Sequence, residues 1–396
     1  MSKTPGPAIA AAWLESHEPE LSVVRRTLHA HPELGRQEYA TTALISGHLE
    51  RAGLSPKVLD GGTGLVCDVG AADGPIVVLR ADIDALPLPD EKDVAYRSQV
   101  PGVSHACGHD VHTTAVLGAG LALAEVAERL PGRVRLIFQP AEEIMPGGAL
   151  EVIAQGWLQD VTAIFGLHCD PALEVGRVGL KQGALTAAAD SVEVRLTGPG
   201  GHTSRPHNTV DLIHALATVA TGLPDALSRL VDPRAGLCLV WGYVSAGVVS
   251  NAIPREGVLR GTLRVLDKAA WQTAPELVRH TVEALAAPYG ARAEVSYERG
   301  VPPVVNDPSA TSLLTAAVQT ALGPGAAVPT AQSLGGEDFA WYLDHAPGSM
   351  ARLGVKPPGL EKPVDLHQGL FDVDEACLGV AVRVMVTAAV AALTAS

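Results

Sequence analysis

IVVLRADID, at residues 76–84, is a short, mainly apolar run that ends in two aspartates. A run of this length predicts a strand that is buried on both faces. Two further apolar runs follow, at residues 134–138 and 163–167. Helical patterns precede or separate these strands, at residues 19–30, 37–52, 110–130 and 148–155. Short buried strands that alternate with helices predict an α/β fold, with a mainly parallel sheet covered by helices on both faces.

The pattern changes in the middle of the chain. Strands are predicted at residues 191–196, 237–244, 257–266 and 293–297, and helices at residues 209–223 and 270–287. This β-α-β-β-α-β order is typical of a ferredoxin-like α+β unit, which we place at residues 182–299. The α/β pattern returns after Pro302 and Pro303. We therefore expect one domain made of residues 1–181 and 300–396, with residues 182–299 inserted into it.

The bulk composition limits the size and the partners of the protein. A chain of 396 residues is long enough for two domains. Its 47% hydrophobic and 18% charged residues are typical of a folded globular protein. The formal net charge of −14 would repel a phosphate backbone or an anionic membrane surface. We expect neither nucleic acid nor a membrane as a partner, and no segment long and apolar enough to span a bilayer.

Five cysteines are spread over the chain, at positions 67, 107, 169, 238 and 377. An odd and sparse set in a large chain argues against a disulfide framework. The apolar run Ala8–Leu14 is short and has no basic lead-in, so we expect no signal peptide. These features predict a cytoplasmic protein with free thiols, which are then available for metal binding or catalysis.

Cys107 and His109 stand two residues apart, just before the helical pattern at 110–130. A thiolate and an imidazole at this spacing suit a borderline metal ion such as zinc, manganese, cobalt or nickel. The alternative interpretation is a buried cysteine beside a capping histidine.

Polar side chains also follow the predicted strands. Asp82 and Asp84 end the first strand, Glu142 and Glu143 follow the second, and His168 ends the third. Sites in open α/β sheets form at the carboxyl ends of strands, so these side chains should meet at one edge. Taken alone, the two glutamates could equally form a solvated acidic turn. His367, in a polar loop near the C-terminus, is weak evidence by itself.

Six motifs in the same order resemble one family. They are LRADIDALP at 79–87, HACGHD at 105–110, PAEE at 140–143, GHTSRPH at 201–207, NAIP at 251–254 and GEDF at 336–339. Together they resemble the aminoacylase and carboxypeptidase metallopeptidases, in the amidohydrolase branch of hippurate hydrolases and indole-acetyl-amino-acid hydrolases. The resemblance runs from Arg26 to Asp374. It implies a hydrolase that cleaves the amide bond of N-acyl amino acids with two divalent metal ions per chain.

The resemblance also implies roles for individual residues. The metal ligands would be Cys107, His109, Glu143, His168 and His367. Five ligands are too few for two separate four-coordinate sites, so shared ligands and bound water must complete the shells, and Cys107 is the candidate for the bridging ligand. Arg80 stands where other branches of the family have a ligand histidine, and it cannot bind a metal ion. Asp82 and Asp84 would support the ligands, while His29, His31, His105 and His112 would be structural.

Glu142 resembles the general base of the family, which moves a proton from the attacking water to the leaving amine. His202, in the inserted lid or dimerisation domain, resembles the histidine that stabilises the oxyanion, often across a dimer interface. Asn251 and Arg264 are candidates for holding a substrate carboxylate or the carbonyl oxygen. The expected partners are therefore a small N-acyl amino acid or dipeptide and a second copy of the chain.

Three alternatives stay open at this point. A dipeptidase or a carboxypeptidase of the same fold would act on related substrates. An amino-acid-binding protein could retain the fold without catalysis, although it would have no need of Glu142. A cysteine hydrolase could use Cys107 with His109, but a spacing of two residues suits one metal ion better than a nucleophile and its base.

Overall fold

The computed structural model describes residues 6–71 and 73–395 in two compact units. The first unit comprises the chain up to Gly183, together with Val305–Ala331 and the residues from Asp338 onward. The second unit comprises Ala184–Val304 and Gln332–Glu337. The segment 332–337 lies outside the range 182–299 expected from the sequence. It joins the second unit because the Ser333 amide donates to the Leu185 carbonyl at 2.8 Å.

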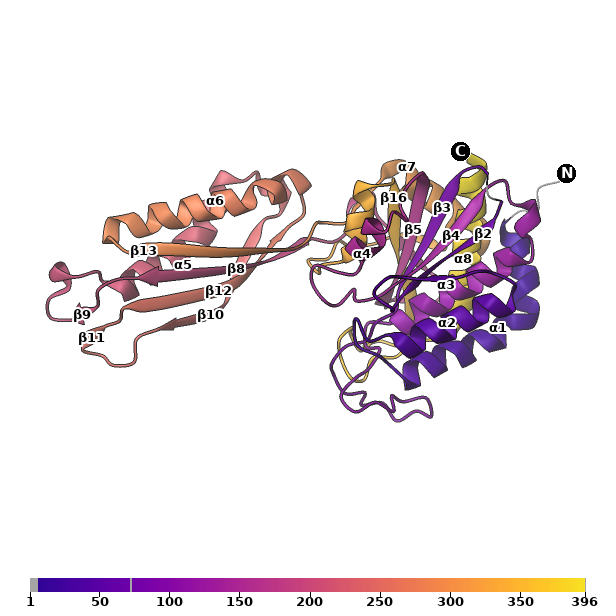
Figure 1. Ribbon diagram of the computed structural model, residues 1–396, viewed down its shortest axis with the longest axis horizontal. Helices are drawn as coiled ribbons and strands as arrows, with labels where there is room; N and C mark the ends of the chain where they lie inside the picture. Colours follow the sequence, from indigo (N-terminus) through magenta and orange to yellow (C-terminus); the bar gives the residue numbers. More distant parts are fainter. Residues whose placement is uncertain (1–5, 72, 396) are drawn as a thin grey trace. The chain divides into compact units, whose positions relative to one another are not determined.

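The first unit is built on one eight-stranded sheet (Figure 1). In spatial order its strands are β1 (Lys57–Val58), β2 (Leu65–Gly70), β4 (Arg133–Gln139), β3 (Ile76–Asp82), β5 (Val161–Glu174), β16 (Gly348–Lys356), β6 (Val178–Leu180) and β15 (Ala327–Pro329). The central strands β4, β3, β5 and β16 run parallel. The expected α/β fold with a mainly parallel sheet is therefore confirmed.

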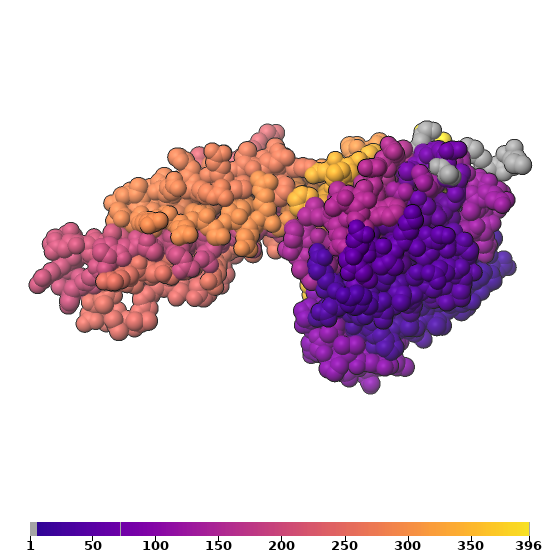
Figure 2. Space-filling model, viewed as in Figure 1, coloured from indigo at the N-terminus to yellow at the C-terminus, as the bar shows by residue number. Residues whose placement is uncertain are grey.

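Helices and turns cover both faces of this sheet. The helices are α1 (Gly6–Ala30), α2 (Tyr39–Arg51), α3 (His109–Ala124), α4 (Ala149–Ala154), α7 (Pro308–Leu322) and α8 (Ala376–Ala395). Phe165 of β5 packs in the main core with α3 and α8. The next residue, Gly166, faces the other way, since a side chain there would meet Phe339 of the short helix η5 (Asp338–Asp344) at 3.2 Å. On the face in Figure 2, the indigo and purple N-terminal segments form much of this unit's surface.

Two helices differ from the sequence prediction. The first begins at Gly6 and not at residue 19, because Ile9, Trp13 and Leu14 continue the buried stripe of its second half. Pro19 lies inside this helix on its exposed side. The helix predicted to reach residue 130 ends at Ala124, and a short 3-10 turn at Ala127–Arg129 follows it.

The helix α8 corrects the expectation that no segment is apolar enough to span a bilayer. By length and composition alone, Ala376–Ala395 would pass as a membrane span. In the structure 72% of that window is buried, and the helix packs against α1, α3 and α7. Its apolar character on all sides is explained by its place in the core.

The second unit has the β-α-β-β-α-β order. Its elements are β8 (Ala188–Thr197), α5 (Leu212–Leu230), β10 (Cys238–Ala246), β12 (Glu256–Val265), α6 (Lys268–Ala286) and β13 (Arg292–Val301). The sheet is antiparallel with the spatial order β10-β12-β8-β13, as in a ferredoxin-like fold. A small two-stranded sheet pairs β9 (Gly201–His202) with β11 (Ala252–Ile253). The remaining short strands are β7 (Gly183–Ala184) and β14 (Val305–Asn306).

Candidate metal centre

The candidate centre lies in the first unit, where β3, β4 and the N-terminus of α3 meet. β3 ends at Asp82, and β4 ends at Gln139, shortly before the two glutamates. Cys107 and His109 flank Gly108, which takes a left-handed conformation with a φ of 84°. A side chain at Gly108 would approach the Cys169 sulfur to 2.7 Å, so only glycine fits there. This tight turn brings the thiol and the imidazole to the same side.

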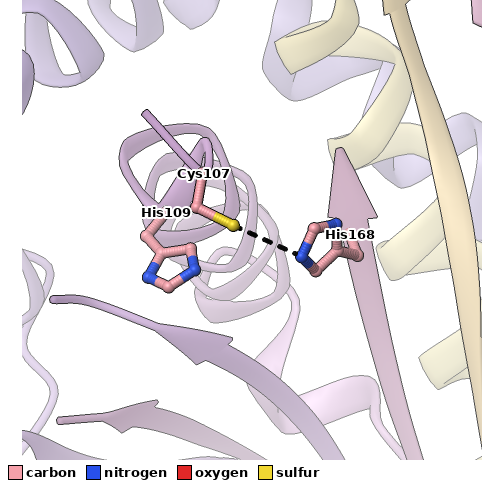
Figure 3. A group of neighbouring side chains, drawn as sticks. All are labelled: Cys107, His109 and His168. Carbon is pink, nitrogen blue, oxygen red and sulfur yellow. Dashed lines mark hydrogen bonds between the residues drawn. The ribbon is translucent and has the colours of Figure 1, made fainter. Parts of the chain in front are cut away.

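Three buried ligand-type side chains form the first group. Cys107, His109 and His168 each offer an atom within 4.8 Å of the others. The Cys107 Sγ lies 3.7 Å from the His168 Nε2, as Figure 3 shows. His168 comes from β5, so strand pairing and the α3 turn together assemble this group.

The two glutamates and His367 complete the cluster. The Glu143 Oε1 lies 3.4 Å from the His367 Nε2 and 3.8 Å from the His109 Nε2. The Glu142 Oε2 lies 4.0 Å from the same His109 nitrogen. His367 has a φ of 60°, and its amide donates to the Ala106 carbonyl at 2.8 Å. This contact holds a loop residue from the far end of the chain beside Cys107.

The hydrogen bonds of the two buried histidines turn their Nε2 atoms toward the cluster. The His109 Nδ1 lies 2.9 Å from the Asp84 carbonyl, and the His168 Nδ1 lies 2.8 Å from the Cys169 carbonyl. A carbonyl can only accept, so each Nδ1 donates, and in the neutral imidazole that binds a metal ion each Nε2 keeps its lone pair. Such an outer contact is typical of histidines that bind metal ions.

Two buried atoms of the cluster are suited to bind a metal ion. The His109 Nε2 and the Glu143 Oε1 are buried and have no hydrogen-bond partner among the described residues. Buried polar atoms are rarely left without a partner, and a missing ion is one reason for such an exception. Burial raises the pKa of the Cys107 thiol, so a nearby cation is needed to hold it as a thiolate. The donor set therefore fits divalent ions of the zinc type.

A buried ionic network supports the centre from behind. The Asp82 carboxylate contacts Arg80 and His112, each at 2.6 Å. Arg80 also contacts Asp338 at 2.7 Å, and Asp338 in turn accepts from the Gln139 side chain at 2.6 Å. Arg80 is thus an ion-pair partner of two carboxylates. Asp338 lies in the GEDF motif, but the sequence analysis assigned it no role.

Asp84 links two of the candidate ligands. Besides its contact with His109, its Oδ2 accepts from the Glu143 amide at 3.0 Å. Glu38 acts on the same turn, since its Oε1 accepts from the Ala141 amide at 2.8 Å. Ala141 has a positive φ of 54°, so this contact stabilises an uncommon backbone conformation. Nothing in the sequence around Glu38 signalled that role.

The other histidines near the centre have different environments. His29 lies between Asp110 and Asp90, at 2.8 and 3.1 Å. Burial lowers the pKa of His105 to about 4, so this residue is neutral. His31 follows the last residue of α1, and its Nδ1 lies 3.0 Å from the Thr27 carbonyl.

The structure brings the five expected ligands and Glu142 together, but the remaining candidates lie in the second unit. His202 and Asn251 are neighbours there, because β9 pairs with β11. Both are exposed, and the His202 Nδ1 accepts from the Ser204 amide at 3.1 Å. Arg264 lies near the C-terminal end of β12, about 25 Å along the strand from the end that follows β11. Its side chain donates to the Leu334 carbonyl at 2.9 Å. Within a single copy of the second unit, Arg264 is therefore far from His202 and Asn251.

The fold and the cluster of thiol, imidazole and carboxylate groups define a metal-dependent hydrolase that acts on amide bonds. The model of Peptidase family M20/M25/M40 matches residues 78–391. The chain belongs to this family, which confirms the resemblance seen in the sequence.

Two relatives and one solved structure show what the chain is similar to. The N-acetyl-L-cysteine deacetylase of Bacillus subtilis is 38% identical over 366 residues, which cover 92% of this chain and 86% of that protein. A putative glutamate–cysteine ligase of Rhodococcus jostii is 50% identical over 94% of this chain, which spans only 47% of that protein. Among solved structures, the YxeP protein of Bacillus subtilis, described as a dinuclear metal-binding peptidase, has a TM-score of 0.85 at 36% identity. That match covers 96% of this chain and 99% of YxeP.

Proposed function

We propose that the protein is an amidohydrolase that removes the acyl group from N-acyl amino acids with two divalent metal ions. The observation that carries the proposal is the buried cluster in which the His109 Nε2 and the Glu143 Oε1 lie 3.8 Å apart and neither atom has a hydrogen-bond partner among the described residues. An acyl-amino-acid substrate is supported by the similarity to the N-acetyl-L-cysteine deacetylase.

Five residues would hold the ions: Cys107, His109, Glu143, His168 and His367. Cys107 belongs to two candidate groups, one with His109 and His168 and the other with Glu143 and His367. His109 is shared by several groups too, but its Nε2 has a single lone pair, whereas one thiolate sulfur can bind two ions. Cys107 would therefore be the residue that the two ions share. Zinc, manganese, cobalt and nickel all suit this mixed donor set. When bound, such ions polarise an amide carbonyl and lower the pKa of water.

Glu142 would act as the general base. Its Oε2 lies 4.0 Å from the His109 Nε2, next to the ligands, while the amide of Glu143 is held by Asp84. In this role Glu142 takes a proton from the attacking water and gives it to the leaving amine nitrogen. The amide bond breaks as that nitrogen is protonated, and the products are a carboxylic acid and an amino acid.

The second unit would contribute His202 as the oxyanion donor and Asn251 and Arg264 as substrate-binding residues. His202 and Asn251 lie at one end of this unit and Arg264 lies near the other. A single substrate could contact all three only if two copies of the chain each supplied part of the site. We therefore propose a homodimer, in which the second unit serves as lid and dimerisation domain.

We also propose that the protein is located in the cytoplasm. The described cysteines are all free, which is compatible with a reducing compartment.

A dipeptidase or carboxypeptidase activity is the second candidate, because the similar YxeP protein is described as a peptidase. The decisive experiment is a substrate panel of acetyl, benzoyl, indole-acetyl and aminoacyl conjugates, assayed with each of the four metals. We expect hydrolysis of acyl conjugates that stops on chelation and returns with metal. Preferential hydrolysis of aminoacyl conjugates would favour the peptidase, and metal-dependent binding without turnover would favour a binding protein.

A further inference from the structure

Arg352 lies beside one of the proposed metal ligands. In the parallel pairing of β16 with β5, Arg352 is the register partner of His168. Neighbouring strands lie about 4.8 Å apart, and register partners point to the same face of the sheet. The Arg352 side chain therefore starts next to His168, on the same face. Both residues belong to the first unit.

The Arg352 guanidinium has no anionic partner among the described residues. Across residues 6–71 and 73–395, its side chain makes no hydrogen bond or ion pair, although it is half-buried. By contrast, Arg25, Arg80 and Arg135 in the same unit each contact an aspartate within 2.8 Å. A partly buried cation without an anion is unfavourable, and divalent ions nearby would add to the repulsion.

Arg352 therefore places a positive charge close to a proposed metal ligand. A bound anion would reduce the repulsion between Arg352 and the metal ions. A planar carboxylate is the group that the guanidinium fork binds best, through two parallel hydrogen bonds.

We propose that Arg352 binds a carboxylate of the substrate beside the metal centre and so selects anionic substrates. The proposal rests on the amidohydrolase function proposed above, and it names a specificity residue that lies in the same unit as the ligands. The carboxylate has two possible sources in an acyl amino acid. It is either the α-carboxylate of the amino acid or the distal carboxylate of a dicarboxylic acyl group.

The test compares three methionine derivatives that differ in where they carry a carboxylate. N-acetyl-L-methionine carries the α-carboxylate, N-acetyl-L-methioninamide carries none, and N-succinyl-L-methioninamide carries only the acyl carboxylate. In Arg352→Met we expect kcat/KM to fall about 10- to 100-fold on the substrate whose carboxylate is bound, since a hydrogen bond to a charged group is lost. The uncharged amide should change less than about 3-fold. Arg352→Lys should recover part of the loss.

Two controls separate recognition from damage to the centre. Arg383→Met removes another half-buried arginine of the first unit, on α8, whose side chain has no hydrogen bond or ion pair among the described residues. This variant should behave like the wild type on all three substrates. The metal content of Arg352→Met should also equal that of the wild type. In an inactive Glu142→Gln background, calorimetric binding should show the same loss for the charged substrate only.

An equal loss on the charged and uncharged substrates, or no loss on any, would overturn the role of Arg352 while leaving the proposed function intact. A wild-type enzyme that hydrolyses no acyl amino acid of the panel would refute the proposed function, and the role of Arg352 with it.

Discussion

The adjacent residues Glu142 and Glu143 should respond to the same substitution in opposite ways. Glu143 lies 3.4 and 3.8 Å from two histidine nitrogens, and its Oε1 has no other partner. Glu142 lies 4.0 Å from only one of these nitrogens. Replacement by glutamine keeps the size of either side chain but removes its negative charge. We expect Glu143→Gln to lose metal and Glu142→Gln to keep it.

The expected size of the effect on turnover follows from the role of each residue. Loss of a positioned general base typically costs about 100- to 10,000-fold in rate. Because each tenfold change corresponds to about 1.4 kcal/mol, Glu142→Gln should raise the activation free energy by about 3 to 5 kcal/mol. KM should change little, since the substrate carbonyl is bound by other groups.

The assay combines two measurements on the same samples. Metal content per chain is determined by mass spectrometry after dialysis, and turnover is measured on the best acyl amino acid of the panel. Added metal should restore part of the activity of Glu143→Gln but none of that of Glu142→Gln. If Glu142→Gln loses its metal while Glu143→Gln retains it, the two assignments are reversed. If neither variant changes turnover, the cluster is not the active site.

Three further predictions concern the ligands, the support and the second unit. Cys107→Ser and His367→Ala should each lower metal occupancy, and a chelator should inactivate the wild type reversibly; full activity of a metal-stripped sample would contradict this. Arg80→Met should lower the free energy of unfolding by about 3 to 5 kcal/mol in a denaturant titration, because it removes the buried cation that two buried carboxylates share; a variant as stable as the wild type would show that the network is dispensable. His202→Ala should lower turnover about 100-fold or more with unchanged metal content. When the His202→Ala protein is mixed with the Glu142→Ala protein and subunit exchange is demonstrated, part of the activity should return. If no activity returns, His202 acts within its own chain or takes no part in the reaction.

Local pattern predicted the parallel sheet and brought several polar residues to one of its edges, whereas the role of each residue followed from the resemblance to the family. Short apolar runs predict buried strands, because both faces of such a strand are shielded from water. The polar residues that end these runs, such as Asp82 and His168, then meet at one sheet edge for geometric reasons. The spacing of Cys107 and His109 is equally local. These features were therefore accessible without any knowledge of tertiary contacts.

The features that depend on tertiary packing could not be obtained in this way. Arg80 was recognised as unable to bind metal, but its ion pair with Asp338 joins residues 258 positions apart. The apolar helix α8 is compatible with either a bilayer or a protein core, and only its burial against α1, α3 and α7 decides between them. Composition reports how apolar a segment is but not what surrounds it.

The sequence by itself determined which residue types are present at the ends of the strands, and so predicted the chemistry of the centre. Only the tertiary structure decided which of these residues face one another. His367 reaches Glu143 through a loop contact with Ala106, and Arg352 stands beside His168 through the register of two strands nearly two hundred residues apart. Strand register and buried charge pairing are set by the packing of the whole unit, because their free energies depend on partners that are distant in the chain.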